Sequence, residues 1–302
     1  MELQGGSPAV QVCSVLLQLT DQGIQRAESD QLPEQIVVKF LTAESRVDRF
    51  LHPGIGGQLE KCDGNHLIFA IQRQLFVDDQ YQGVYLLMEQ ISRSEERINV
   101  TEINEKLQKT GYIVRLDRKH DDPEQINTFT DYTYILDVTQ AMDVKYPGTE
   151  KLTEPLRAFI ERDLGEVEKA LYSFDYDSRD FGYRQLLDVD SFVDYFIINE
   201  FFRNVDAGSY STYLYRSLGG KVGICVWDFN NMLDNYQEIE LPVEGFFMPD
   251  KPWFFMLCKD EYFIERVIQR YKLLRQSVLS ETALLAMIDE TQTYLGPAIE
   301  RN

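Results

Sequence analysis

The chain has 302 residues, of which 44% are hydrophobic and 26% charged, and its 30 basic and 50 acidic residues give a formal net charge of −20. This composition is typical of a globular protein whose core is large enough for one domain or two lobes. The negative charge argues against a nucleic-acid-binding protein or a polybasic membrane-surface protein, because both need a positive field. No apolar run approaches the roughly 20 residues of a membrane span, so we expect neither a nucleic-acid partner nor a transmembrane segment.

Cysteine and histidine are sparse. The four cysteines lie far apart without a CxxC pair, which argues against zinc ribbons and dense disulfide frameworks; buried free thiols are the simpler interpretation, and one or two isolated bridges stay open. None of the three histidines has HExxH spacing, so acid–base chemistry is expected to use carboxylates. The N-terminus lacks a signal-peptide pattern, which is consistent with a cytoplasmic protein or with a sequence that begins downstream of its natural start.

The first 120 residues are dominated by strand patterns. A polar stretch at 20–34 permits a helix, and the polar segment 117–130, which contains Pro123, is predicted to be a loop. Strands are predicted at 12–19, at 35–41, at 67–91 as two strands around a turn at 78–80, and at 111–116.

Two helices are predicted in the middle of the chain from apolar residues at helical spacing. The first is expected at 153–174, with Thr153 as its N-cap. The second is expected within 188–204, where Asp190 or Ser191 can cap it. So much of the second helix is aromatic or aliphatic that we expect it at the centre of a lobe.

A hairpin and a helical region complete the chain. The strands predicted at 211–216 and 221–229 are joined by Gly219-Gly220, which is a strong hairpin turn signal, and residues 253–299 are predicted to be largely helical. The order of elements predicts an α+β protein with two lobes. We expect a strand-rich N-terminal lobe at 1–100 and a mainly helical C-terminal lobe at 101–302, with the boundary near residues 90–110.

The segment 201–231 carries the pattern most typical of chemistry. An apolar helix leads into a loop with Asp206, and a hairpin then delivers Asp228. Protein kinases build their site from a loop Asp that accepts the hydroxyl proton, a metal-binding side chain five residues later, and a metal-binding Asp after a hairpin. Here Ser211 stands five residues after Asp206, and Arg203 precedes Asp206 where kinases have an Arg-Asp pair, with two residues inserted.

Each part of this pattern also has a structural interpretation, because a loop Asp commonly forms a turn and a Trp-Asp-Phe sequence can simply end a strand. The ordered set is more specific, since two acids placed by a hairpin can converge on one Mg²⁺. No GxxxxGK[ST] or GxGxxG loop is present. A protein of this charge therefore needs a divalent metal and a few placed cations to bind a triphosphate.

Five segments taken together resemble the CotH family, first known from bacterial spore coats, which has an atypical protein-kinase-like fold. The resemblance covers roughly residues 67–302, and the first 60 or so residues match poorly. The segments are FVDDQYQGVYLLMEQI, GYIVRLDR, VDSFVDYFIINEFFRNVDAGSYSTYLYR, VWDFNN and PWFFML…RYKLLR.

The resemblance implies ATP- and Mg²⁺-dependent phosphorylation of Ser/Thr in protein substrates, with coat or envelope proteins as partners and a spore-coat or cell-surface location. Asp206 matches the family's catalytic-loop Asp, and Asp228 matches its metal-binding Asp. Glu89 and Gln90 follow a strand that resembles the segment beside the nucleotide. One departure is Ser211, which stands where members often have Asn, so that a hydroxyl replaces an amide as the metal ligand.

Several assignments stay open. The family's basic, glycine-containing N-terminal motif is not recognisable, so the phosphate-binding lysine is unassigned. Lys39, in QIVVKFL, has the right strand context, although a solvent-facing lysine is the simpler interpretation. Arg203 either orients the catalytic loop or caps the helix C-terminus by its charge, and Asn230 and its neighbour Asn231 either help to hold Mg²⁺ or form a turn. Weaker candidates for the phosphate-binding cation are Arg115, Lys119 and Lys221.

Three functions compete on this sequence. The first is a kinase-like phosphotransferase, and the second is a catalytically degenerate structural or surface-binding protein on the same fold. The serine at the metal position and the unassigned lysine favour the second. The third is a carboxylate-based glycosidase or Mg²⁺ phosphohydrolase, which uses the same acids without the kinase-like order.

Overall fold

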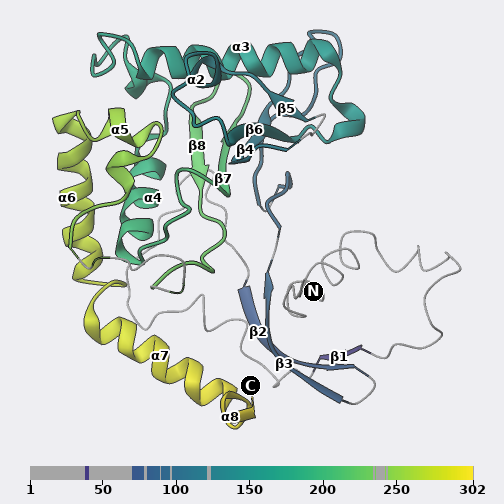
Figure 1. Cartoon of the computed structure of the whole chain (residues 1–302), viewed down its shortest axis with the longest axis vertical. Helices are drawn as coiled ribbons and strands as arrows, with labels where there is room; N and C mark the ends of the chain where they lie inside the picture. Colours follow the sequence, from purple (N-terminus) through teal and green to yellow (C-terminus); the bar gives the residue numbers. More distant parts are fainter. Residues whose placement is uncertain are drawn as a thin grey trace, which may run out of the picture. The chain divides into compact units, whose positions relative to one another are not determined.

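The computed structural model describes residues 38–40, 70–77, 80–88, 90–95, 97–120, 124–233, 235, 242 and 244–301. The chain forms two compact units, Met1–Gln90 with Glu281–Asn302, and Ile91–Ser280. The division into lobes at 1–100 and 101–302 stays a prediction. Figure 1 labels the α-helices and β-strands of both units.

The first unit contains a three-stranded antiparallel sheet in the order β1-β2-β3. The predicted hairpin at 67–91 is confirmed, and the strand expected at 35–41 is present in part; the elements expected at 12–34 lie outside the described residues. Residues near the C-terminus contact this sheet. Tyr81 Oη donates to the Ala298 carbonyl (3.5 Å), and Arg301 Nη2 donates to Gln74 Oε1 (3.0 Å). The elements are β1 (Val38–Phe40), β2 (Ala70–Val77), β3 (Gln80–Met88), α7 (Glu281–Leu295) and α8 (Ala298–Arg301).

The second unit is built on a five-stranded antiparallel sheet in the order β5-β6-β4-β7-β8. In its register Leu116 of β4 opposes Thr212 of β7, and Tyr213 of β7 opposes Cys225 of β8. The end of β4, the start of β7 and the end of β8 therefore lie at one end of the sheet. The strands are β4 (Tyr112–Arg118), β5 (Gln125–Ile126), β6 (Gln140–Tyr146), β7 (Thr212–Arg216) and β8 (Val222–Cys225).

Helices follow and flank this sheet. Helix α4 is central, as its composition predicts: Phe192 and Phe196 are buried, and their rings contact Phe254. Figure 1 shows α4 and α6 side by side, and Arg270 of α6 pairs with Asp194 of α4 at 2.7 Å. Among the described residues, no helix combines the length and apolarity needed to cross a membrane. The elements are α2 (Phe129–Tyr132), η3 (Thr149–Lys151), α3 (Glu154–Leu171), η4 (Tyr183–Gln185), α4 (Val189–Phe201), η5 (Met248–Asp250), α5 (Phe254–Leu257) and α6 (Glu261–Arg275).

Strand alternation gives the sheet two different faces. On the helix-covered face, Tyr112 Oη donates to Asp163 Oδ2 of α3 (3.0 Å), and the hydroxyls of Tyr195 of α4 and Thr212 lie 3.2 Å apart. On the opposite face, Ile113 forms a buried cluster with Tyr213 of β7 and with Ile98 and Val100 from the segment that precedes β4. Because successive residues of β4 alternate between these faces, Arg115 and Arg118 belong to opposite sides of the sheet.

Some predicted boundaries are wrong. The segment 117–130 is not all loop, because β4 continues to Arg118 and the segment also contains β5 and the start of α2. Strand β6 was not predicted at all. Its central Asp143 interrupts the apolar pattern, and this carboxylate is buried because Arg115 of the neighbouring strand binds it at 2.7 Å. Burial of a charge is favourable only with such a partner.

Two element ends near the candidate site also differ from the prediction. The N-cap of α4 is Asp188 rather than Asp190 or Ser191. Strand β8 ends at Cys225, three residues before Asp228, so that Asp228 lies in irregular backbone after the hairpin and not at the end of its second strand.

Glu168 of α3 binds Thr130 of α2 and Trp253, which precedes α5, and so connects three helices of the second unit. Its carboxylate accepts hydrogen bonds from the Thr130 amide (2.9 Å), the Thr130 hydroxyl (2.7 Å) and the indole N–H of Trp253 (3.1 Å). Burial raises the pKa of Glu168, against the lowering effect of these donors. Because the carboxylate is buried, its hydrogen bonds fix α2 and the start of α5 on α3.

We expect Glu168→Gln to lower the free energy of unfolding by about 1–3 kcal/mol, because an amide NH₂ must face a buried donor in either orientation. Urea unfolding followed by circular dichroism measures the difference. The matched control is Glu166→Gln on the same helix, where the carboxylate is exposed and contacts Lys169; it should change stability by less than about 0.5 kcal/mol. Equal effects of the two variants would contradict a structural role for Glu168.

Candidate active site

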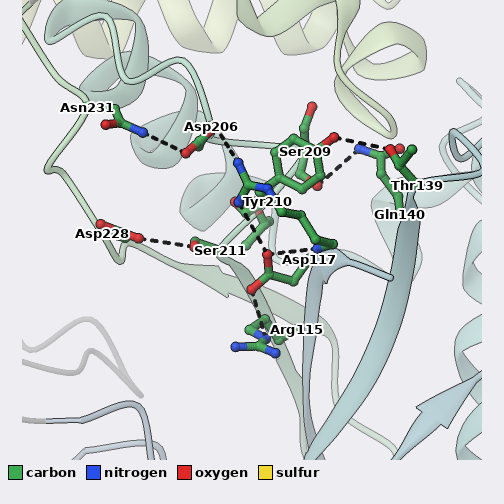
Figure 2. A network of polar contacts seen from close by, with 12 residues as sticks. Arg115, Asp117, Thr139, Gln140, Asp206, Ser209, Tyr210, Ser211, Asp228 and Asn231 are labelled. Carbon is green, nitrogen blue, oxygen red and sulfur yellow. Dashed lines mark hydrogen bonds and ion pairs between the residues drawn. The ribbon is translucent and has the colours of Figure 1, made fainter. Parts of the chain in front are cut away.

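Three residues predicted from the sequence, Asp206, Ser211 and Asp228, lie together at one end of the five-stranded sheet (Figure 2). Residues 202–211, here called the first loop, connect α4 to β7. Residues 226–233, here called the second loop, follow β8. Their closeness follows from the strand register, since β7 begins at the end of the sheet where β8 stops.

Two side-chain hydrogen bonds connect these loops. Ser211 Oγ donates to Asp228 Oδ2 at 3.2 Å, and Asn231 Nδ2 donates to Asp206 Oδ2 at 2.8 Å. Figure 2 shows both interactions. Each acidic side chain is therefore held by a polar side chain of the other loop, which places both carboxylates in one polar network.

Asn204 connects the backbones of the same two loops. The residue is 3% exposed, and Nδ2 donates to the Asp228 carbonyl (3.1 Å) and to Asn199 Oδ1 of α4 (3.0 Å). Its own Oδ1 is buried and has no hydrogen-bond partner within the described part of the chain. The Leu233 amide adds a backbone bond to the Phe202 carbonyl (2.8 Å), so that both loops are also joined through their main chains.

The backbone is strained at the residues that carry the pattern. Arg203, Ser211 and Asp228 have φ values of 52°, 48° and 56°, in the left-handed region that non-glycine residues rarely adopt. Such conformations cost of order 1 kcal/mol or more each, persist only where the surroundings enforce them, and cluster at functional sites. The interloop bonds provide that enforcement at Ser211 and Asp228.

Lys251 packs against the first loop and donates a hydrogen bond to its backbone. Its Nζ donates to the Val205 carbonyl at 2.8 Å. At Gly208, where φ is 78°, an added Cβ would lie 2.9 Å from Cβ of Lys251, so the loop packs directly on this side chain. Burial lowers the pKa of Lys251, while the nearby charges of Asp206, Asp250 and Glu200 act in the opposite direction.

Arg118, the last residue of β4, is a second cation that the structure brings near Asp206. Its Nη2 lies 3.8 Å from Asp206 Oδ1. The guanidinium also lies over the ring of Tyr210, with its central carbon 4.2 Å from the ring centroid, which is a cation–π arrangement. The Arg118 side chain remains 54% exposed.

Two of the other cations considered as phosphate ligands, Arg115 and Lys221, are engaged elsewhere. Arg115 binds Asp143 at 2.7 Å and Asp117 at 3.2 Å. Burial lowers the pKa of Arg115, but the hydrogen bond to Asp143 and the charge of Asp117 outweigh it and raise the pKa overall. Lys221 donates to the Arg184 carbonyl (2.9 Å) just before β8, at the opposite end of the strands from Asp228.

A pocket of about 540 Å³ lies beside the first loop. Ser209 and Tyr210 of the loop line it, together with Lys251. Further walls come from the aromatic side chains Tyr172 and Phe255. Since these loop residues stand between Asp206 and Ser211 in the sequence, the pocket adjoins the loop that carries the predicted base.

Two further residues predicted from the sequence are Arg203 and Asn230. Arg203 Nη1 binds Glu200 Oε2 (3.3 Å), and its Nη2 donates to the Gly245 carbonyl (2.9 Å). These contacts fasten the end of α4 to the segment before η5. Asn230 is exposed, and its carbonyl accepts from Asn235 (2.6 Å), whereas it is Asn231 that contacts Asp206.

The predicted nucleotide neighbours belong to the first unit. Lys39 lies in β1, where its backbone opposes Phe76 of β2. Gln90 is exposed after β3, and Glu89 lies outside the described residues. The roles of all three stay predictions.

Asn204, Arg118 and Lys251 were not singled out by the sequence. Asn204 offered a weak signal, because it stands two residues before Asp206 at the end of an apolar helix. Arg118 ends the segment GYIVRLDR, which carries part of the family resemblance, but nothing in that segment indicates its contact with the first loop. Lys251 offered no signal, since it contacts the first loop only through packing of distant segments.

Oxygen donors at the site suit Mg²⁺. No three His, Cys, Asp or Glu side chains of the described chain form a metal-binding group, but Mg²⁺ commonly takes one or two carboxylates and completes its octahedron with water and substrate phosphates. Neighbouring ligands of an octahedral Mg²⁺ at 2.0–2.1 Å lie about 2.9 Å apart. The 3.2 Å between Ser211 Oγ and Asp228 Oδ2 is close to that spacing, so these two side chains fit one ion.

We expect Asn204→Ala to lower the free energy of unfolding by about 1–3 kcal/mol, because it leaves the buried Asn199 Oδ1 and the Asp228 carbonyl without their donor. Chemical denaturation measures the loss. Asn230→Ala, which removes an exposed amide from the same region, should change stability by less than about 0.5 kcal/mol. A stable Asn204→Ala protein would mean that the two loops do not depend on this bond.

Comparison with known proteins agrees with the resemblance that the sequence motifs carry. No curated protein matches the chain. Residues 66–302 match the family model described as CotH kinase protein, which spans the first-unit hairpin, both loops and all helices that follow. The chain therefore belongs to the CotH kinase protein family, whose membership implies a kinase-like fold and ATP use.

Proposed function

We propose that this chain is a protein phosphotransferase that moves the γ-phosphoryl group of ATP to a Ser or Thr hydroxyl. The observation that carries the proposal is the pair of interloop bonds, Ser211 to Asp228 and Asn231 to Asp206. They gather, in kinase-like order, the two acids that such a site needs. Membership of the CotH kinase protein family supports the same class of reaction.

Asp206 is proposed to accept the proton of the acceptor hydroxyl. The hydroxyl oxygen forms a bond to the γ-phosphorus while the bond from phosphorus to the β–γ bridging oxygen breaks, and ADP leaves with that electron pair. The hydroxyl proton passes to the Asp206 carboxylate. Asn231, which donates to one oxygen of that carboxylate, fixes its orientation and leaves the other oxygen for the acceptor.

Asp228 and Ser211 are proposed to hold Mg²⁺, with Asn230 as a further oxygen donor of the second loop. When bound, Mg²⁺ neutralises phosphate charge and orients the triphosphate. The protein carries a net charge of −20, so its own residues supply little of that neutralisation. Arg203 positions the first loop through Glu200 and Gly245. In the first unit, we propose Lys39, Glu89 and Gln90 as neighbours of the nucleotide.

The pocket beside the first loop is proposed to receive the acceptor segment of the protein substrate. It adjoins Tyr210 and Ser209, four and three residues after Asp206. Its volume of about 540 Å³ suits one or two side chains of a bound peptide.

Substitution of Asp206 or Asp228 tests the proposed phosphotransferase activity. With γ-labelled ATP, Mg²⁺ and a generic Ser/Thr acceptor, Asp206→Asn should lower kcat by about 10²–10⁴-fold, the range for loss of a general base. Asp228→Asn or added EDTA should abolish transfer. Asp180→Asn, an exposed acid away from both loops, is the matched control and should behave like wild type. If wild type transfers no label and Mg-ATP leaves its Tm unchanged, the proposal fails, and the degenerate binding protein takes its place.

Ser211→Asn tests the proposed metal position separately. Asn tolerates the left-handed backbone found at Ser211, where φ is 48°, and its amide oxygen is a better Mg²⁺ ligand than a hydroxyl. We expect the Mg²⁺ concentration for half-maximal transfer to fall in Ser211→Asn and to rise in Ser211→Ala, each by up to about tenfold, or 1.4 kcal/mol. Identical Mg²⁺ dependence in all three proteins would remove Ser211 from the metal site.

A further inference from the structure

We propose that Arg118 is a further catalytic residue, whose guanidinium binds the phosphoryl group during its transfer. This inference rests on the proposed phosphotransferase function and names a cation for it. The sequence pattern left the phosphate-binding cation unassigned, and the structure brings Arg118, from the end of β4, to the predicted base.

The position of Arg118 follows from the sheet. In β4 it opposes Gln140 of β6, at the same end of the sheet as the start of β7. Its side chain projects from the helix-covered face, and Nη2 reaches to 3.8 Å from Asp206 Oδ1. Tyr210 then holds the guanidinium plane, 4.2 Å from its ring centroid. Figure 2 shows Tyr210 beside Asp206 in this network.

Arg118 is held differently from the structural arginines of the same sheet. Arg115 donates to buried Asp143 at 2.7 Å, and Arg216 donates to Asp163 at 2.9 Å. Arg118 instead lies 3.8 Å from Asp206 and 3.9 Å from Asp117, distances too long for hydrogen bonds. Exposed ion pairs of this kind contribute little to stability. Stacking on Tyr210 thus orients the guanidinium while its N–H donors stay available to a ligand.

Reaction geometry brings the phosphoryl group to this guanidinium. An acceptor hydroxyl bonded to Asp206 lies roughly 2.6–3.2 Å from its carboxylate, and the reacting oxygen and phosphorus approach to about 3–3.5 Å. A guanidinium 3.8 Å from the same carboxylate can therefore reach phosphoryl oxygens by side-chain rotation alone. A planar guanidinium suits this ligand, because it donates to two phosphate oxygens at once.

The nearby lysine does not substitute for Arg118. Lys251 directs its ammonium group to the Val205 carbonyl at 2.8 Å and is half-buried against the first loop. Because Arg118 would contact the group in transfer and not the part that remains in ADP, its removal should affect turnover and triphosphate binding more than diphosphate binding.

The test compares Arg118→Ala and Arg118→Lys with wild type, using Mg-ATP and a generic Ser/Thr acceptor. Calorimetry with ADP and with a non-hydrolysable ATP analogue gives the two affinities. We expect Arg118→Ala to lower kcat by about 100-fold or more, to weaken analogue binding, and to leave ADP binding and Tm unchanged. Arg118→Lys, which keeps the charge but loses the planar fork, should lie in between. Arg162→Ala, an exposed arginine over Phe159 of α3, is the matched control and should equal wild type.

The outcomes separate this inference from the proposed function. If wild type transfers phosphate and Arg118→Ala does so at the same rate with the same analogue affinity, the inference is overturned and the proposed function stands. If wild type neither binds nucleotide nor transfers phosphate, both are overturned. Equal weakening of ADP and analogue binding with unchanged kcat would also overturn the catalytic role, because it would mean ground-state contact with the diphosphate.

Discussion

Antiparallel pairing of β4 with β7, and of β7 with β8, brings the end of β4, the start of β7 and the end of β8 to one end of a sheet. The site depends on this register, because a shift by one residue would turn every side chain of a strand to the other face. With the register as it is, Arg118 projects toward Asp206, and the first loop ends next to the point where the second loop begins. The chemistry of the site thus depends on the alternation that also buries Ile113 on one face and Leu214 on the other.

The two loops hold each other in conformations that neither would adopt alone. Left-handed backbone at Ser211 and Asp228 is unfavourable for non-glycine residues, and the bonds between the loops offset that cost. Asn204 contributes from within the core, where its amide joins α4 to the second loop. Such preorganisation suits phosphoryl transfer, in which the protein acts mainly by positioning groups and stabilising charge.

Local patterns predicted local structure well and distant contacts poorly. Gly219-Gly220 predicted the β7–β8 hairpin, and the aromatic run of α4 predicted a central helix, because both signals lie within one segment. Strand β6 was not predicted because it contains Asp143. The charge of Asp143 is compatible with a buried strand only when Arg115, 28 residues earlier in the chain, is paired beside it. The order of Asp206, Ser211 and Asp228 indicated a shared site, whereas the contact of Arg118 with Asp206 follows from strand pairing that no short motif encodes.

We propose that the first and second loops hold one divalent cation beside the bound nucleotide. Electron paramagnetic resonance measures it directly, because Mn²⁺ replaces Mg²⁺ and its free signal falls on binding. In the presence of ADP, wild type should bind Mn²⁺ with a defined stoichiometry, and Asp228→Asn should bind it at least tenfold more weakly, a difference of about 1.4 kcal/mol. Equal Mn²⁺ binding by the two proteins would contradict the account.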